Sequence, residues 1–437
     1  MSPILVLTGL LIVAYFGSIL VGGRAIRGFG LPSGTEFLLL GILVGPKAMG
    51  LVTRSSLTGF EPLTLVALGW LALTTGVHYG YSGEHRVPAR RMLAGITLAL
   101  VTLVVSALAT LGVALAFTSI RGEDLVLLCL GVGCVSCETT RHAVRWVAQR
   151  YEAEGPLVRL VADVCEADDA VPLVLLAVIF ALVPHAEGPE GWPGIARVLA
   201  NLGVGAVMGG TCAALVDIEP RLSQRWGIVL GTSLLGMGAS IRLGLSAVST
   251  MFIMGIVTSA LSRERLALHD MLAGTERAVM LPALVLAGAS AVYPGADPLF
   301  ALTAAALLAR LFVKIAAGAL FVRATGAPAL VGPSLGLGLL PAGVLTITAG
   351  LTFALQVRGP IGDVVLAIAT INAVVGELVG PAMLRRALAF AGEVRAADSV
   401  MPVRRLAPAL RPKRRPGTRA SFASTPDPRR SDPEGRT

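Results

Sequence analysis

The chain has 437 residues, of which 54% are hydrophobic and only 14% are charged, against about 25% charged residues in typical soluble domains. So little charge cannot cover a surface that faces water, which excludes a soluble protein and predicts an all-α, polytopic membrane protein. The net charge of +9 does not indicate nucleic-acid binding, because eleven Lys and Arg against five Asp and Glu lie in a proline-rich tail, residues 391–437. We expect this tail to be disordered and to face the anionic cytoplasmic surface of a lipid membrane.

Hydropathy divides the rest of the chain, residues 1–390, into thirteen apolar segments that we interpret as transmembrane helices. They cover residues 3–22, 34–52, 60–81, 91–118, 124–141, 157–184, 194–216, 225–243, 245–262, 275–293, 297–322, 329–356 and 360–388. Arginine sets the orientation, because residues 86–91 are basic whereas residues 185–194 carry no Lys or Arg. Since basic loops stay in the cytoplasm, we expect the N-terminus outside and the C-terminus inside the cell (inner) membrane.

Two of the segments are interrupted by composition, and they hold matching places in the two halves of the chain. If segments 1–6 and 8–13 are repeats, partners lie seven apart and run in opposite directions, which defines an inverted repeat. The fifth segment has Gly133, Ser136, Glu138 and Thr139 where apolar residues are expected, and the twelfth is glycine-rich around Pro341. Glycine also permits close helix packing. The matching places nevertheless favour two broken, crossing helices, whose free backbone groups are typical of transporter ion sites.

Four carboxylates fall inside the sixth segment, at Asp163, Glu166, Asp168 and Asp169. A buried carboxylate is costly unless it is paired, hydrated or protonated. Asp168 and Asp169 point about 100° apart around a helix, so they face different surroundings. Oxygen ligands gathered in one turn suit a hard monovalent cation, for which Asp168 and Asp169 are the candidate ligands. Asp163 is expected at the hydrated cytoplasmic mouth. Glu166 either belongs to the site or lies at this mouth as well.

Lysine is rare in this chain, with three residues against 33 arginines. One of the three, Lys314, lies inside the eleventh segment. A lysine there is informative because, unlike arginine, it can lose its proton when it is desolvated. Arg310 lies one turn away on the same helix face, and either cation can pair with Asp168. Helix ends are uncertain by about a turn, so depth along the helix does not choose between them.

Over residues 3–390 these features resemble the cation:proton antiporter superfamily, the sodium/proton and potassium/proton exchangers of bacterial membranes. LLLGILVGPKAMGL at residues 38–51 resembles the early Gly-Pro helix of that family, and the broken helix with Ser136 and Thr139 precedes the pair Asp168-Asp169. KIAAGALFVR, which begins at Lys314, resembles the family's lysine helix, and PAMLRRAL at residues 381–388 resembles its closing proline segment.

The resemblance implies roles for individual residues. Asp169 becomes the carboxylate that carries cation and proton, Asp168 becomes the partner of Lys314, and Ser136 and Thr139 border the site. It also implies a homodimer whose protomers have three parts. These parts are a dimer domain at about residues 3–81 and 225–293, a linking helix at about 194–216, and a moving core at about 91–184 and 297–388.

The chain departs from the family pattern in the second broken helix. Many members carry a Gly-Glu pair there, whereas this chain has Gly343 followed by valine and has additional acids at Glu138 and Glu377. Either acid can replace the missing one. Our leading hypothesis is an electrogenic antiporter that exchanges Na⁺ or K⁺ for protons by an elevator motion and needs no cofactor. The alternatives are a transporter of another substrate, such as an organic anion, and a membrane ion sensor or scaffold. No nucleophile–base pair or phosphate loop indicates an enzyme.

The topology can be tested by labelling single cysteines from each side of the membrane. Cysteines placed in the Arg86–Arg91 loop and in the tail should react only from the cytoplasm, because basic loops are retained there. One placed in the Glu187–Gly191 loop should react only from outside. Labelling of the tail from outside would contradict the model of thirteen spans.

Overall fold

The computed structural model describes residues 3–22, 33–82, 85–182, 192–292, 296–325 and 334–394. These ranges are almost wholly helical and contain a single short hairpin, in which β1 (Tyr81–Ser82) pairs with β2 (His85–Arg86). The predicted all-α class is therefore confirmed. Residues 391–394 of the predicted tail are described, and there the Glu393 carboxylate accepts hydrogen bonds from the first free N–H groups of a helix, those of Leu157 and Val158. The rest of the tail lies outside the described residues.

The thirteen apolar segments contain more than thirteen helices. The helices are α1 (Pro3–Gly22), α2 (Thr35–Val44), α3 (Arg54–Gly59), α4 (Glu61–His78), α5 (Ala89–Phe117), α6 (Glu123–Cys137), α7 (Arg141–Arg150), α8 (Pro156–Asp168), α9 (Ala170–Leu182), α10 (Gly194–Ile218), α11 (Leu222–Arg242), α12 (Ala247–Leu261), α13 (Arg265–Ser290), α14 (Ala296–Thr325), α15 (Ser334–Gly338), α16 (Val344–Gln356) and α17 (Pro360–Phe390). The sixth segment divides into α8 and α9, and the twelfth into α15 and α16. The division in the sixth segment has a local cause, because Pro172 has no N–H to bond the carbonyl of Asp168.

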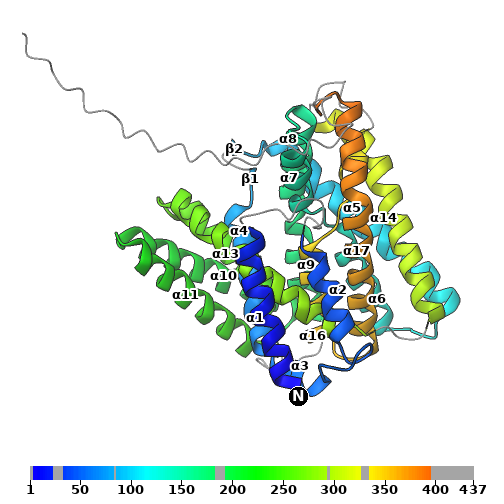
Figure 1. Cartoon of the computed structure of the whole chain (residues 1–437), viewed down its shortest axis with the longest axis horizontal. Coiled ribbons are helices and arrows are strands. Elements are labelled where there is room, and N and C mark those ends of the chain that lie inside the picture. The colour runs from blue at the N-terminus through cyan, green and yellow to red at the C-terminus, as the bar shows by residue number, and fades with distance from the viewer. Residues whose placement is uncertain are drawn as a thin grey trace, which may run out of the picture. The chain divides into compact units, whose positions relative to one another are not determined.

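Five of the described helices are long and apolar enough to cross a membrane: α5, α10, α13, α17 and residues 298–318 of α14. Shorter apolar helices include α2, α12 and α16. The chain is therefore a multi-pass membrane protein, while the number of thirteen spans stays a prediction. Figure 1 shows α5 and α14 side by side, and α10 and α11 side by side in another part of the helical region.

Helix α14 has two charged side chains inside and several large apolar side chains outside. Arg310 and Lys314 are buried, whereas Phe300 and Phe312 on the same helix are 76% and 70% exposed. In water this arrangement would be unfavourable, but in a membrane the outer face meets lipid and the charges must face protein. The orientation of α14 therefore directs two cations into the helical bundle.

Pairs of glycines let four helices approach closely. A Cβ atom at Gly288 of α13 would lie 2.1 Å from the carbonyl oxygen of Leu38 in α2, and one at Gly41 would lie 2.2 Å from that of Val285. Gly76 of α4 and a glycine of α12 make a similar contact. Because hydrophobicity does not drive helices together within lipid, such close backbone packing is a main source of association.

This packing predicts that Gly288→Ala is destabilising. The new methyl group would overlap backbone atoms, which cannot move as a flexible side chain can, so we expect a loss of about 1–3 kcal/mol. Gly274→Ala in the same helix is the matched control, because no atom lies within 4 Å of the added Cβ atom. Apparent melting temperatures in detergent, followed by tryptophan fluorescence, would measure the difference. Equal melting temperatures for the two variants would contradict the close α2–α13 contact.

Candidate functional site

Two non-helical stretches meet in the interior of the bundle. Helix α6 ends at Cys137, and the extended residues Glu138–Thr140 precede α7. Residues 339–343 likewise separate α15 from α16. The Thr140 N–H donates to the carbonyl of Pro341 over 3.2 Å, so the two stretches lie against each other. Each stretch leaves carbonyl oxygens without the hydrogen bonds of a continuous helix.

Arg310 of α14 binds these free carbonyls. Its Nε donates to the Ser136 carbonyl over 3.0 Å, and Nη1 donates to that of Leu340 over 2.8 Å. Nη2 donates to the carbonyls of Glu138, over 2.8 Å, and Pro341, over 3.0 Å. Within the described ranges the guanidinium forms no ion pair with a carboxylate, so the alternative in which it pairs with Asp168 is not realised. A cation is suited to this place because helix C-terminal ends carry partial negative charge.

Lys314, one turn further along α14, makes the ion pair instead. Its Nζ lies 3.1 Å from Oδ2 of Asp168, and both side chains are fully buried. The same ammonium donates to Oγ1 of Thr139 over 2.7 Å and to the carbonyl of Cys137 over 2.8 Å. These contacts use all three donors of an ammonium group. The Thr139 N–H donates to the other carboxylate oxygen of Asp168 over 3.2 Å, so Asp168 is also well satisfied.

Asp169, the next residue, has the opposite surroundings. It lies between α8 and α9, its side chain is 1% exposed, and neither carboxylate oxygen has a hydrogen-bond partner. The nearest cation is Arg141, whose Nη1 is 3.9 Å from Oδ2. Buried polar groups nearly always have partners, so a buried carboxylate without one is a candidate ligand-binding group.

A small cavity adjoins Asp169. Its polar lining comes mainly from Glu138, Thr140, Arg141, Asp169 and Glu276. The free space is about 10 Å³, which is room for about one water-sized particle. A single dehydrated monovalent cation or one water molecule fits such a space, whereas a larger organic substrate does not.

The structure brings together only some of the predicted site residues. Thr139 contacts the Lys314–Asp168 pair, whereas the Ser136 hydroxyl donates to Val132 in its own helix and does not line the cavity. Gly133 lies inside α6 rather than at its end, and a Cβ atom there would be 2.8 Å from the carbonyl oxygen of Leu103. Its predicted role as a break residue is therefore wrong, and its role is close packing against α5.

Pro341 and Gly343 do lie in the non-helical stretch that precedes α16. A Cβ atom at Gly343 would be 2.7 Å from the hydroxyl oxygen of Thr140, so glycine permits the two stretches to touch. The Gly343 N–H donates to the Glu138 carboxylate over 3.3 Å, and the Thr346 hydroxyl donates to the same oxygen. Glu138 is therefore a buried, hydrogen-bonded acid at the cavity and not a solvated mouth residue.

The remaining predicted acids are also buried. Glu377 accepts hydrogen bonds from the N–H and the hydroxyl of Ser33. Asp163 was expected at a hydrated mouth but is ion-paired with Arg91 over 2.6 Å and lies 3.0 Å from His85. The expectation was wrong in its detail because side chains from α5 and β2 cover this carboxylate.

Glu166 does not lie at a hydrated mouth either. It is buried, and its carboxylate lies 3.3 Å from Arg141 and 3.7 Å from Arg145. Arg141 in turn pairs with Glu276 of α13 over 3.0 Å. The sequence pattern did not single out Arg141 or Glu276. A signal was present for Glu276, because an acid inside an apolar segment is costly and calls for a partner.

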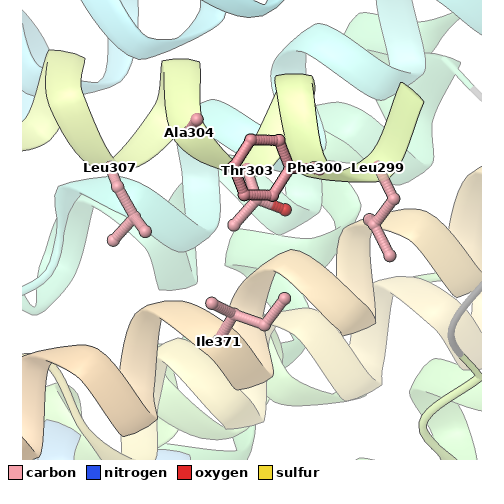
Figure 2. Close-up of a pocket in the computed structure, with 6 residues that line it drawn as sticks. All are labelled: Leu299, Phe300, Thr303, Ala304, Leu307 and Ile371. Carbon is pink, nitrogen blue, oxygen red and sulfur yellow. The ribbon is translucent and has the colours of Figure 1, made fainter. Parts of the chain in front are cut away.

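A larger cavity, of about 370 Å³, lies between α14 and α17. Figure 2 shows its apolar lining, with Phe300, Leu307 and Ile371 around a single hydroxyl, that of Thr303. No ionisable side chain lines it, so it offers no chemistry for an ion. The small cavity at Asp169 is therefore the candidate site despite its size.

No protein-family model matches the chain, and a search of curated proteins also finds no match. Its fold is similar to that of the sodium proton antiporter MjNhaP1 from Methanocaldococcus jannaschii. A structure of that protein at pH 8 has a TM-score of 0.66 and 15% sequence identity, and the match covers 90% of this chain and 100% of that chain. A second structure, from electron microscopy, has a TM-score of 0.63 and 16% identity over 89% and 98% of the chains. The chain therefore shares the fold of this sodium proton antiporter, which is the fold that the sequence resemblance implies.

The buried Lys314–Asp168 ion pair predicts how single and double substitutions change the stability of the protein. Lys314→Met leaves Asp168 charged without a cation, so we expect a loss of about 3–5 kcal/mol. Adding Asp168→Asn should recover part of this loss, because no unpaired charge then remains. Lys47→Met at the exposed Lys47 is the control and should change little. Melting in detergent measures all three. A double variant less stable than Lys314→Met would show that the ion pair is not what stabilises this region.

Proposed function

We propose that the chain is a secondary active antiporter that exchanges a monovalent cation, Na⁺ or K⁺, for protons across the cell membrane. The observation that carries this proposal is Asp169, a buried carboxylate without a hydrogen-bond partner beside a cavity for one small particle. In such surroundings a carboxylate is stabilised by a proton or by a cation. A group that holds either one, but not both, couples the movements of the two ions.

In this proposal each nearby residue has a distinct role. Asp169 carries the cation and the proton alternately, and Asp168 contributes a second ligand after it separates from Lys314. Carboxylate, hydroxyl and carbonyl oxygens are the ligands that hard cations prefer. Glu138 lines the same cavity and supplies the acid that the second interrupted helix lacks. Thr139 orients both members of the Asp168–Lys314 pair through its hydrogen bonds.

The exchange is proposed to proceed by an elevator motion of a core within a homodimer in the inner membrane, with the N-terminus outside. Arg310 and Lys314 support this proposal, because they bind α14 to the end of α6, and Arg310 also binds the stretch before α16. Elements held by so many buried charge-assisted bonds are expected to move as one body. The two interrupted segments are then the crossing helices of an inverted repeat.

The organic-anion alternative is less favoured by the described residues. Such a substrate needs a cation that is free to bind it, but four of the five Arg310 N–H donors go to carbonyls and Lys314 uses its three donors. Arg141, which lines the cavity, is already paired with Glu166 and Glu276. The cavity beside Asp169 is also too small for it. The sensor alternative is distinguished by transport, because a sensor binds an ion without exchange.

Exchange can be measured in proteoliposomes with an internal pH dye after Na⁺, K⁺ or Li⁺ is added. Wild type should move protons with at least one of these cations. Asp169→Asn should reduce exchange to the level of empty vesicles, because a neutral amide neither takes up a proton nor has a charge that binds a cation. Asp124→Asn, at the exposed first turn of α6, is the control and should exchange normally. Full exchange in Asp169→Asn would remove the central role of this residue.

Electrogenic exchange is a separate expectation. If the cation separates Asp168 from Lys314, the buried ammonium loses its partner and releases a proton in addition to that of Asp169. Two protons then move against one cation, and 100 mV shifts the exchange equilibrium by about 2.3 kcal/mol, or a factor of about 50. Lys314→Arg should abolish the voltage dependence, because arginine does not release its proton. An ion gradient independent of the clamped potential in wild type would indicate electroneutral exchange.

A further inference from the structure

Arg141, which begins α7, is shared by acids from different parts of the fold. Its Nη2 donates to Oε1 of Glu276 over 3.0 Å, and its Nη1 donates to the two carboxylate oxygens of Glu166 over 3.3 and 3.5 Å. The same Nη1 lies 3.9 Å from Asp169. All four side chains are buried. One guanidinium thus faces three carboxylates, and only Asp169 receives no hydrogen bond from it.

The unequal distances show what decides the position of Arg141. Bonds between N–H and oxygen are typically about 2.9 Å long, so Arg141 is about 1 Å too far to bond Asp169. The shortest of its contacts is with Glu276, and this bond helps to hold the guanidinium in its observed position. If that contact were lost, the nearest acid without a hydrogen-bond partner would be Asp169. A flexible arginine side chain can cover a gap of this size by rotation about its own bonds.

Glu276 belongs to a different group of helices from the other members. Helix α13 packs mainly against α1, α2 and α4, with a smaller contact to α16, whereas α7 packs against α8 and α17. Glu166 and Asp169 both come from the chain between α7 and α9. The Arg141–Glu276 pair therefore joins two groups of helices, and His142 adds a second contact to Glu276 over 3.4 Å.

We infer that Glu276 is a positioning residue that holds Arg141 away from Asp169, and that Arg141 competes with the transported cation for Asp169 when the Arg141–Glu276 pair breaks. This inference rests on the proposed function. Arg141 is a cation tethered beside the site, so it can neutralise Asp169 without being transported. Movement of α13 relative to α7 then changes the affinity of Asp169 for the cation. The Arg141–Glu276 pair thus links the positions of the two helix groups to cation binding at Asp169.

Competition makes a specific prediction for Glu276→Gln. The variant loses the charge that holds Arg141, so the cation concentration for half-maximal exchange should rise about tenfold, the size expected for one buried charge-assisted hydrogen bond. Arg141→Gln added to Glu276→Gln removes the competitor, so the half-maximal concentration should return towards the wild-type value. A purely structural ion pair would not produce this recovery.

The matched control is Glu264→Gln. Glu264 directly precedes α13 and pairs with Arg225 over 3.1 Å, away from the cavity lining, so its removal should leave the half-maximal concentration unchanged. Cation-dependent rises in melting temperature give the same affinities without transport. If Glu276→Gln aggregates, Glu276→Asp replaces it. This variant keeps the charge on a shorter side chain and should shift the affinity in the same direction.

The results separate the two proposals. Wild-type exchange together with an unchanged half-maximal concentration in Glu276→Gln would overturn the role of Glu276 and leave the proposed function intact. A rise that persists in the double variant would also overturn it, because the competitor would then be absent. If wild type neither exchanges nor is stabilised by any of the cations, the proposed function fails and this inference fails with it.

Discussion

The fold around the candidate site depends on how two buried cations satisfy interrupted helices. Helices that stop inside a membrane leave carbonyl groups that water cannot reach, and each such group is costly. Arg310 and Lys314 bind these carbonyls at the ends of α6 and near α15, and they bring α14 into contact with both. The outer face of α14 is apolar and meets lipid, so the helix can turn both charges inward. Removal of these cations would leave several carbonyls without partners and the Asp168 carboxylate without a counter-ion.

The same arrangement makes two neighbouring aspartates chemically different. Asp168 has the Lys314 ammonium and the Thr139 N–H as partners, whereas Asp169 has no hydrogen bond and only a distant guanidinium. Buried charges without close partners are costly, and proteins retain them where they act. Under the proposed function, Asp168 and Lys314 maintain the local structure until a cation arrives, while Asp169 stays available to it. Arg141 and Glu276 then determine how available it is.

Much of this site could be predicted from the sequence, because charged residues are rare within membrane-spanning segments and usually mark functional sites. Three features of the apolar segments indicated site residues. A lysine in one segment indicated Lys314, and two adjacent aspartates in another indicated Asp168 and Asp169. Glycine with proline in a third indicated Pro341. The contacts of Arg310 could not be predicted, because carbonyl groups are present at every residue and only the tertiary structure shows which are free. The burial of Asp163 and Glu138 depends on side chains from other parts of the fold, such as Arg91 and Thr346. The sequence does not single out Arg141, the last residue of the fifth predicted segment, because its burial depends on acids from α8 and α13.

Proton release on cation binding tests the central claim most directly. Calorimetric titration of the purified protein with Na⁺ or K⁺, in buffers that differ in ionisation enthalpy, gives the number of protons released for each cation bound. If Asp169 holds one ion or the other, wild type should release at least one proton per cation at a pH where the empty site is protonated, and Asp169→Asn should show neither binding nor release. Binding without proton release in wild type at every pH would contradict the account.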